Sequence, residues 1–223
     1  MPGLLFSGGG LAARELPQAQ LPLLQAYHDA NPEYFLTING RMPPPGFARQ
    51  EFDERPPAHM PYSQRWFAGL WDMPAVWEVR EVREAREARE VRNERQGRHE
   101  HEALAGAIEL LSDFMAPGVW HLGFFGVATR LHGSGAAPRV FDALCAWAEA
   151  QGAAWMRLGV VQGNARAERF WAHHGFVEVR LRHGVDTGGR LNTIRVMVRP
   201  LVRGRVEDYL QLVVRDRPES PLA

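Results

Sequence analysis

The most constraining feature of the sequence is a glycine-bearing turn that joins an apolar run to an amphipathic segment. The apolar run, Trp120–Val127, predicts a buried strand. In the segment Pro138–Gln151, apolar residues at 140, 141, 144, 145 and 148 follow the spacing of one helix face, and Gly152 supplies a stop. Pro138 fits the first turn of this helix, which needs no N–H there. The order strand, turn, helix leaves N–H groups at the turn that suit a phosphate or pyrophosphate.

By itself, a Gly-x-Gly turn is equally consistent with a plain connection whose glycines supply unusual φ angles. A second segment makes the pattern more specific. A predicted strand, Ala154–Val161, leads into a predicted helix over residues 165–173. The two connections read Arg130-x-x-Gly-x-Gly-Ala and, about thirty residues later, Asn164-x-x-Ala-x-x-Phe-Trp-x-x-x-Gly-Phe.

In this order and spacing, the two motifs resemble the acetyl-CoA loop and the following block of the GNAT superfamily of N-acetyltransferases, over roughly residues 103–200. The resemblance implies an α/β (α+β) fold with a mixed, mostly antiparallel sheet of about six or seven strands, flanked by helices and splayed at the cofactor site. It also implies acetyl-CoA as co-substrate and direct transfer of the acetyl group to an amine of a small molecule or peptide.

The same resemblance assigns the donor site. The pyrophosphate is expected on the N–H groups from Leu131 to Ala136, and the pantetheine arm along the strand end at Phe125–Val127, where Gly123 and Gly126 permit close approach. Asn164 is carried over as a cofactor contact, although it can also simply cap its helix. The full expected set is Phe125, Gly126, Val127, Arg130, Leu131, His132, Gly133, Ser134, Gly135, Ala136, Asn164, Phe170 and Trp171.

Acetyl transfer to an amine needs a base, because an alkyl ammonium with a pKa of about 10.4 is mostly protonated at neutral pH. Period-two alternation places residues 119, 121, 123 and 125 on one strand face, and His121 is the titratable group among them. It lies where several family members carry a glutamate, and a reference pKa of about 6.5 suits a base. Glu109, on the preceding strand, is the competing base. The alternative for both is a satisfied polar residue at a sheet edge.

The sequence departs from the family pattern at the general acid. Many members carry a tyrosine next to the phenylalanine of the second motif, whereas this chain has Trp171, which cannot protonate a thiolate. Either another group or water then acts as the general acid, or no acid is needed. Trp171 itself either packs against Phe176 or lines the thioester site. Cys145 falls on the apolar helix face, which indicates a buried thiol and direct transfer.

Two helices are predicted near the N-terminus, over Leu21–Ala30 and from an Asn31 cap to Gly40, with a further helical turn over residues 47–52. In the family, such paired helices form a wall of the acceptor pocket. This implies His28, Tyr34 and Arg41 as substrate-side residues. Alternatively, Tyr34 packs the helix pair and His28 faces water.

The remaining elements complete one domain over residues 1–223. Strands are predicted at residues 11–15, 64–71, 103–111, 176–182 and 192–198. The connection between the strands at 64–71 and 103–111 contains a Glu-Val/Ala-Arg repeat at about residues 76–98. A three-residue repeat does not place its apolar residues on one face of a helix, and the Glu and Arg charges of this repeat cancel. We therefore expect the segment to be a solvated arm. The extension at about residues 201–223 either covers the core or pairs with a second subunit in a homodimer.

The composition limits which partners the protein is expected to bind and in which cellular compartment it is expected to lie. Lys plus Arg and Asp plus Glu number 26 each, so net charge predicts no nucleic-acid or membrane partner. One cysteine and an N-terminus unlike a signal peptide are typical of a cytoplasmic protein. His99 and His101 lack a third ligand at a recognisable spacing, so no metal site is expected.

Two further functions fit the same motifs. One is a GNAT-like domain that binds CoA or senses a ligand with little catalysis, which the absent tyrosine keeps open. The other is an acetyltransferase that acts on a protein N-terminus or lysine. The acceptor itself depends on loops that the motifs do not specify.

Overall fold

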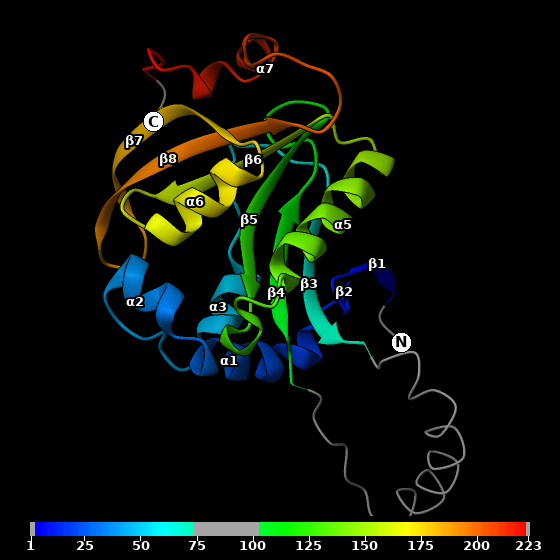
Figure 1. Cartoon of the computed structure of the whole chain (residues 1–223). Coiled ribbons are helices and arrows are strands. Elements are labelled where there is room, and N and C mark those ends of the chain that lie inside the picture. The colour runs from blue at the N-terminus through cyan, green and yellow to red at the C-terminus, as the bar shows by residue number, and fades with distance from the viewer. Residues whose placement is uncertain (1–2, 74–102, 222–223) are drawn as a thin grey trace, which may run out of the picture.

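A computed structural model describes residues 3–73 and 103–221 (Figure 1). The charged repeat at residues 76–98, His99 and His101 lie outside the described residues. The strands are β1 (Leu4–Gly8), β2 (Leu11–Glu15), β3 (Arg65–Asp72), β4 (Gly106–Leu111), β5 (Val119–Val127), β6 (Trp155–Val161), β7 (Val177–Asp186) and β8 (Leu191–Pro200). The helices are α1 (Leu21–Ala30), α2 (Glu33–Asn39), α3 (Phe47–Asp53), α5 (Ala136–Ala150), α6 (Ala165–His173) and α7 (Val206–Leu212), with 3₁₀ turns η1 (Gln18–Gln20), η2 (Thr129–Leu131) and η3 (Val214–Asp216).

The strands form a single sheet in the order β1-β2-β3-β4-β5-β6-β8-β7. Every neighbouring pair is antiparallel except β5 and β6. The predicted mixed, mostly antiparallel α/β fold is thus confirmed, with eight strands rather than six or seven. The sequence prediction missed β1, which has no clear alternation, although the Gly9-Gly10 turn after it is a hairpin signal.

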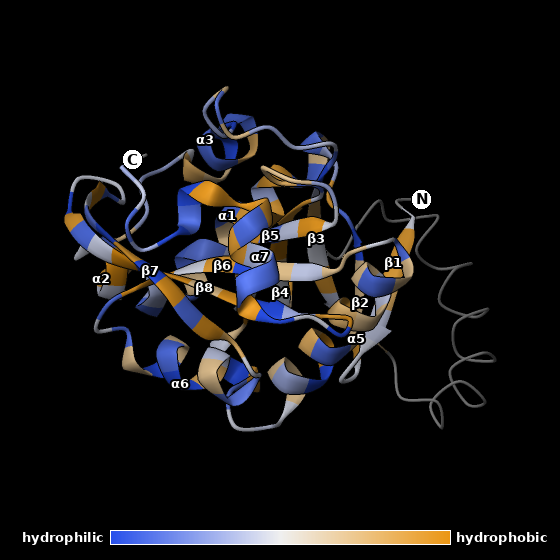
Figure 2. Ribbon diagram, turned by 90° about the horizontal axis from the view of Figure 1, so that it is seen from above, coloured by the Kyte–Doolittle hydropathy of each residue, from blue (hydrophilic) through white to orange (hydrophobic). Residues whose placement is uncertain are grey.

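Apolar side chains of the strands point to both faces of the sheet, and helices cover each face. On β4, Ile108 and Leu110 pack in the core beneath α5 and α6, whereas Ala107 packs with α1 and α3 on the other face. Val196 and Val198 of β8 face that same second side, where they pack with α7. Figure 2 shows the strands between α5 and α6 on one side and α1 and α3 on the other. None of the helices in the described parts of the chain is long and apolar enough to cross a membrane.

The parallel pairing of β5 and β6 covers only part of their length. It runs from Val119–Trp155 to Leu122–Leu158, after which β5 continues to Val127 paired with β4 but no longer with β6. Strand β6 remains paired with β8 as far as Val161. The sheet therefore opens between its two central strands, as the sequence predicted.

A bulge at Gly123 changes which face of β5 each residue occupies. Glu109 of β4 pairs with Phe124, and the next residue, Leu110, pairs with Leu122, which leaves Gly123 as an extra residue. Phe125 consequently packs on the α5 side, while Phe124 packs with α1. The prediction that residues 119, 121, 123 and 125 share one face is wrong beyond the bulge.

Helix α5 begins at Ala136, so Pro138 occupies its third position and lies in the first turn, as predicted. The predicted start of α2 is corrected. Asn31 does not cap α2. Its side-chain nitrogen instead donates to the Tyr27 carbonyl at 2.7 Å, and its oxygen accepts from the Thr129 N–H at 2.7 Å. This residue therefore joins α1 to the connection that follows β5.

The C-terminal extension covers the second face of the sheet. Tyr209 is fully buried against Trp155, Val196 and Val198. Asp216, also fully buried, forms a two-pronged ion pair with Arg157 of β6, at 2.7 Å to Nε and 3.0 Å to Nη2. The Tyr209 hydroxyl donates to the same carboxylate at 2.5 Å. The extension is thus part of the core.

This buried pair predicts a large effect of removing one partner. The variant Asp216→Asn leaves the Arg157 guanidinium buried without its counter-charge, so we expect the free energy of unfolding to fall by about 3–5 kcal/mol. Denaturant titration measures it. Asp53→Asn breaks the half-exposed Arg49–Asp53 pair and serves as the matched control, with an expected loss below about 1 kcal/mol. Equal losses in the two variants would contradict the assignment.

The difference between wild type and Asp216→Asn also depends on pH. Burial raises the pKa of Asp216, but Arg157 and Tyr209 together lower it more, and the net pKa lies below the usual 3.8. A carboxylate with a lowered pKa contributes stability that is complete above about pH 4 and disappears as the pH falls through its folded-state pKa. The stability gap between the two proteins should therefore shrink in strong acid.

Candidate functional site

The turn after β5 has the geometry of an anion-binding nest. Gly133 and Gly135 adopt positive φ angles of 80° and 77°, and Gly135 stands at the N-cap of α5. The N–H groups of both glycines donate no hydrogen bond within the described parts of the chain. Unpaired N–H groups at a left-handed turn, next to the positive end of a 15-residue helix, suit a phosphate.

Neighbouring residues hold this turn in shape. The Ser134 hydroxyl donates to the Leu131 carbonyl at 2.7 Å and accepts from the Ala136 N–H at 3.2 Å. His132 Nε2 lies 3.0 Å from the Val127 carbonyl, so a proton on that nitrogen ties the turn to the end of β5. Ser134 and His132, both expected cofactor contacts, therefore already take part in internal hydrogen bonds.

Two arginines flank the turn. Arg130 pairs with Asp72 at the end of β3, with both side chains about half exposed. Arg139 donates from Nη2 to the Ser134 carbonyl at 3.1 Å, and its guanidinium lies against Gly135. The sequence prediction did not include Arg139. An arginine one turn into the helix after a Gly-x-Gly turn is the signal that was available.

The second motif forms the opposite end of the opening. Asn164 caps α6, its side chain accepting from the Ala167 N–H at 3.2 Å. Trp171 is buried and makes edge-to-face contacts with Phe125 and Phe176 at 5.7 and 5.4 Å between ring centroids. Phe170 stacks on Phe125 at 6.0 Å. Both aromatic residues of the motif thus pack against Phe125, on the α5 side of the sheet, where β5 no longer pairs with β6.

Glu109 lies on the other face, at the bulge. Its Oε2 would come within 2.5 Å of a Cβ at position 123, so a larger residue there would displace the carboxylate. Its Oε1 accepts from Arg65 Nε at 2.6 Å, and its side chain is 19% exposed. Burial raises the pKa of this carboxyl above its usual 4.5, and the charge of Arg65 only partly offsets the increase. The group is thus a stronger base than a solvated glutamate.

His121 lies on the same face, two residues before the bulge. Its ring stacks on Phe114 at 4.6 Å, and Nδ1 lies 3.2 Å from both the carbonyl and Nη1 of Arg157. Burial, followed by the positive charge of Arg157, lowers the pKa of His121 to about 3. The imidazole is therefore neutral at physiological pH and a much weaker base than the usual histidine.

Aromatic and acidic side chains from the N-terminal helices, β4 and β5 gather at the end of β5 that no longer pairs with β6. The Tyr27 hydroxyl would come within 2.5 Å of a Cβ at Gly126. Tyr34, 41% exposed, meets Phe124 edge to face at 5.2 Å. Although the ring is partly exposed, burial of the Tyr34 hydroxyl, with the charges of Glu51 and Glu109, raises the pKa of that hydroxyl. This group of Tyr27, Tyr34, Glu51, Glu109 and Phe124 is hereafter the acidic wall.

Two of the expected substrate-side residues lie elsewhere. His28 is fully buried rather than exposed to substrate or water, in a cage of aromatic rings that includes Phe35, Phe47 and Phe124. Its Nε2 lies 2.8 Å from Glu51, so it supports the acidic wall from behind. Arg41 donates to the Gly188 carbonyl at 2.6 Å and links α2 to the β7–β8 turn.

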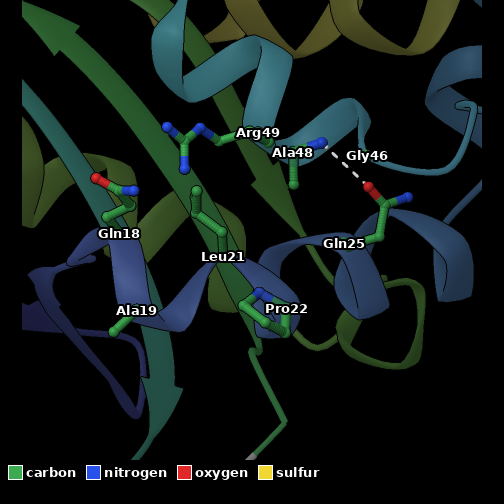
Figure 3. A pocket seen from close by; sticks show the side chains of 8 residues that line it. All are labelled: Gln18, Ala19, Leu21, Pro22, Gln25, Gly46, Ala48 and Arg49. Carbon is green, nitrogen blue, oxygen red and sulfur yellow. Dashed lines mark hydrogen bonds between the residues drawn. The ribbon is translucent and has the colours of Figure 1, made fainter.

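Other parts of the described chain are weaker candidates for a functional site. A surface hollow of about 600 Å³ between η1, α1 and α3 is lined mainly by apolar atoms, and its charged residue, Arg49, pairs with Asp53 (Figure 3). None of the residues lining it belongs to the nest, to the opening or to the acidic wall. Burial raises the pKa of the Cys145 thiol to about 12, which leaves it unreactive. No cluster of three or more potential metal ligands occurs in residues 3–73 and 103–221.

Solved structures with the same fold are acetyltransferases. An acetyltransferase from Thermus thermophilus matches with a TM-score of 0.57 and 17% identity, over 85% of this chain and 96% of that one. The spermidine N-acetyltransferase from Vibrio cholerae, in complex with CoA and spermine, gives 0.56 and 13%, over 86% and 96%. The ribosomal-protein-S18-alanine N-acetyltransferase from Escherichia coli gives 0.54 and 14%, over 87% and 96%. At these identities the likeness establishes the fold.

The family follows from the sequence match. The model of the acetyltransferase (GNAT) family matches residues 47–176, more than half of the chain, and the chain belongs to that family. The matched range runs from α3 to Phe176 and so includes the nest, the opening and the second motif. No curated protein sequence gives a significant match.

Proposed function

We propose that the protein transfers the acetyl group of acetyl-CoA directly to an amine of a small molecule or peptide. The observation that carries the proposal is the coincidence of three features at one end of β5. These are the nest with unpaired N–H groups at Gly133 and Gly135, the opening between β5 and β6, and the carboxylate of Glu109 at the bulge.

The donor is expected to span the nest and the opening. The pyrophosphate would accept hydrogen bonds from the two glycine N–H groups, with Arg139 close by. The pantetheine arm would add along β5 where β6 no longer pairs with it, by main-chain hydrogen bonding. The positions from Phe125 to Ala136 that the sequence predicted for the donor fall along this path.

Glu109 is the proposed base. The amine nitrogen attacks the thioester carbon, its proton passes to Glu109, and the C–S bond breaks. A raised carboxyl pKa makes this transfer more favourable, and the carboxylate needs no rearrangement because Arg65 already holds it. His121, the other predicted base, is less suited because its lowered pKa makes it a weak proton acceptor.

The Tyr27 hydroxyl is the proposed partner of the leaving thiolate. It lies against Gly126 and donates no hydrogen bond within the described parts of the chain. Burial raises its pKa, so it stays protonated and can donate a hydrogen bond to a developing negative charge. This assigns to α1 the role that the sequence left open when Trp171 replaced the family tyrosine.

A screen of amines for release of free CoA tests the proposal as a whole. Steady-state release with a small amine supports it. Saturable CoA binding without turnover for small amines, peptides and protein substrates would instead favour a CoA-binding or ligand-sensing protein. Turnover confined to protein substrates would favour acetylation of a protein N-terminus or lysine.

The nest predicts a loss of donor binding when Gly135 carries an acidic side chain. Gly135→Glu should weaken CoA binding by about 100-fold or more, because it places a negative charge where the pyrophosphate belongs and crowds Arg139, 2.8 Å from the new Cβ. Isothermal titration with CoA measures this. Gly152→Glu is the matched control, since Gly152 has φ +96° at the other end of α5 and open space around it. Unchanged affinity in Gly135→Glu would exclude the nest as the donor site.

The assignment of the base predicts a change in rate and pH dependence. Glu109→Gln should lower kcat by about 100-fold, in the range of a general base, and remove the decline in kcat/KM on the acid side of the profile. His121→Gln should keep that decline, because His121 is already neutral there. Glu54→Gln, an exposed nearby carboxylate, controls for charge. A Glu109→Gln profile like that of wild type would remove Glu109 from the reaction.

A further inference from the structure

The face of the sheet that carries Glu109 is hereafter the acceptor face. A cluster of arginines lies on this face, on the β6–β7 side of the opening, whereas the acidic wall lies on the β4 side. Arg180 and Arg182 extend from β7 on the same face as Arg157 of β6, and Arg215 comes from the C-terminal extension. Arg180 donates to the carbonyl oxygens of Arg215 and Ser220, which ties the extension to β7. We call Arg157, Arg180, Arg182 and Arg215 the arginine cluster.

Two members of the cluster, Arg182 and Arg215, have no carboxylate partner within the described parts of the chain. Asp216 is the carboxylate at its centre, and its oxygens already accept from Arg157 and Tyr209. The side chain of Arg182 is half-buried and forms no hydrogen bond or ion pair within residues 3–73 and 103–221. The Nε of Arg215 is buried and has no hydrogen-bond partner in that same part of the chain. Half-buried guanidinium groups that repel one another cost free energy unless an anion joins them.

The strand register places this charge beside the opening. Arg182 pairs with Ile194 on β8, and Ile194 pairs with Val161, beyond the point where β6 leaves β5. Arg157 continues the cluster toward β5, because its Nη1 lies 3.2 Å from His121. Burial, then the charges of Arg215 and Arg157, lowers the pKa of Arg182, so the guanidinium groups affect one another. The acceptor face therefore has carboxylates on one side and excess guanidinium charge on the other.

We infer that the acceptor carries an anionic group, a carboxylate or phosphate, in the same molecule as its amine, and that Arg182 and Arg215 bind that group. This rests on the proposed function, because it places the amine of the same molecule near Glu109. A guanidinium fork fits both carboxylate and phosphate oxygens. The nest lies at the start of α5, on a different connection from the arginine cluster, so the cluster is separate from the proposed pyrophosphate site.

Matched pairs of amines test the inference. We would compare amino acids with the amines left after loss of the carboxylate, such as phenylalanine with phenethylamine, and phosphoethanolamine with ethanolamine. The anionic member should have the higher kcat/KM, and the two sets distinguish carboxylate from phosphate. Arg182→Gln and Arg215→Gln should each raise KM for the anionic member by about 10- to 100-fold, with little change for the neutral one. Arg203→Gln removes an exposed arginine and should change neither.

Folding is monitored separately. Arg182→Gln removes a repelled charge without a partner, so its melting temperature should equal or exceed that of wild type. A marked decrease, with KM unchanged, would show that Arg182 is structural and overturn the inference. Preference for the neutral amines, or equal KM values in wild type and both variants, would also overturn it.

Failure of the proposed function is distinguishable from failure of this inference. If no amine is acetylated, the cluster is still probed by thermal stabilisation with inorganic phosphate. Wild type and Arg182→Gln share the same nest, so a larger stabilisation of wild type reports on the cluster. Equal stabilisation of the two proteins by phosphate would contradict an anion site there, whatever the enzyme does.

Discussion

The structure depends on the point at which β5 and β6 stop pairing. Beyond Leu122–Leu158, β6 stays with β8, while the extra residue at Gly123 bends β5 and rotates Phe125 toward α5. This separation exposes main-chain groups of β5 at the same end as the nest. It also sets Glu109 against glycine backbone, where a larger residue at position 123 would collide with the carboxylate. One irregularity in a strand thus positions both halves of the proposed reaction.

The two sides of the opening are supported by different parts of the chain. On one side, the buried His28 holds Glu51 and Arg65 holds Glu109, so the acidic wall is fixed by α1, α3 and β3. On the other side, the Arg157–Asp216 pair secures the C-terminal extension, which brings Arg215 next to the arginines of β7. Deleting the extension would therefore remove part of the acceptor face as well as part of the core.

Elements with strong periodicity or a turn signal could be predicted from the sequence, including α1, α5, α6 and the β3–β4 hairpin. The nest could be predicted because glycine permits the positive φ angles that such a turn needs. The contact of Trp171 with Phe176 was one of the two alternatives that the sequence left open. The bulge could not, since no local signal distinguishes Gly123 from an ordinary strand glycine. The pKa values of His121 and Glu109 depend on Arg157 and Arg65, partners far apart in sequence. The burial of His28 likewise depends on rings from three separate elements.

The central claim is that the donor binds at the nest and at the end of β5 that β6 leaves free, and it is tested most directly by amide hydrogen exchange with and without acetyl-CoA. We predict slower exchange on binding across residues 123–136, with little change in β1 and β2. Protection confined to the hollow lined by Leu21 and Arg49, with exchange unchanged across residues 123–136, would contradict the account.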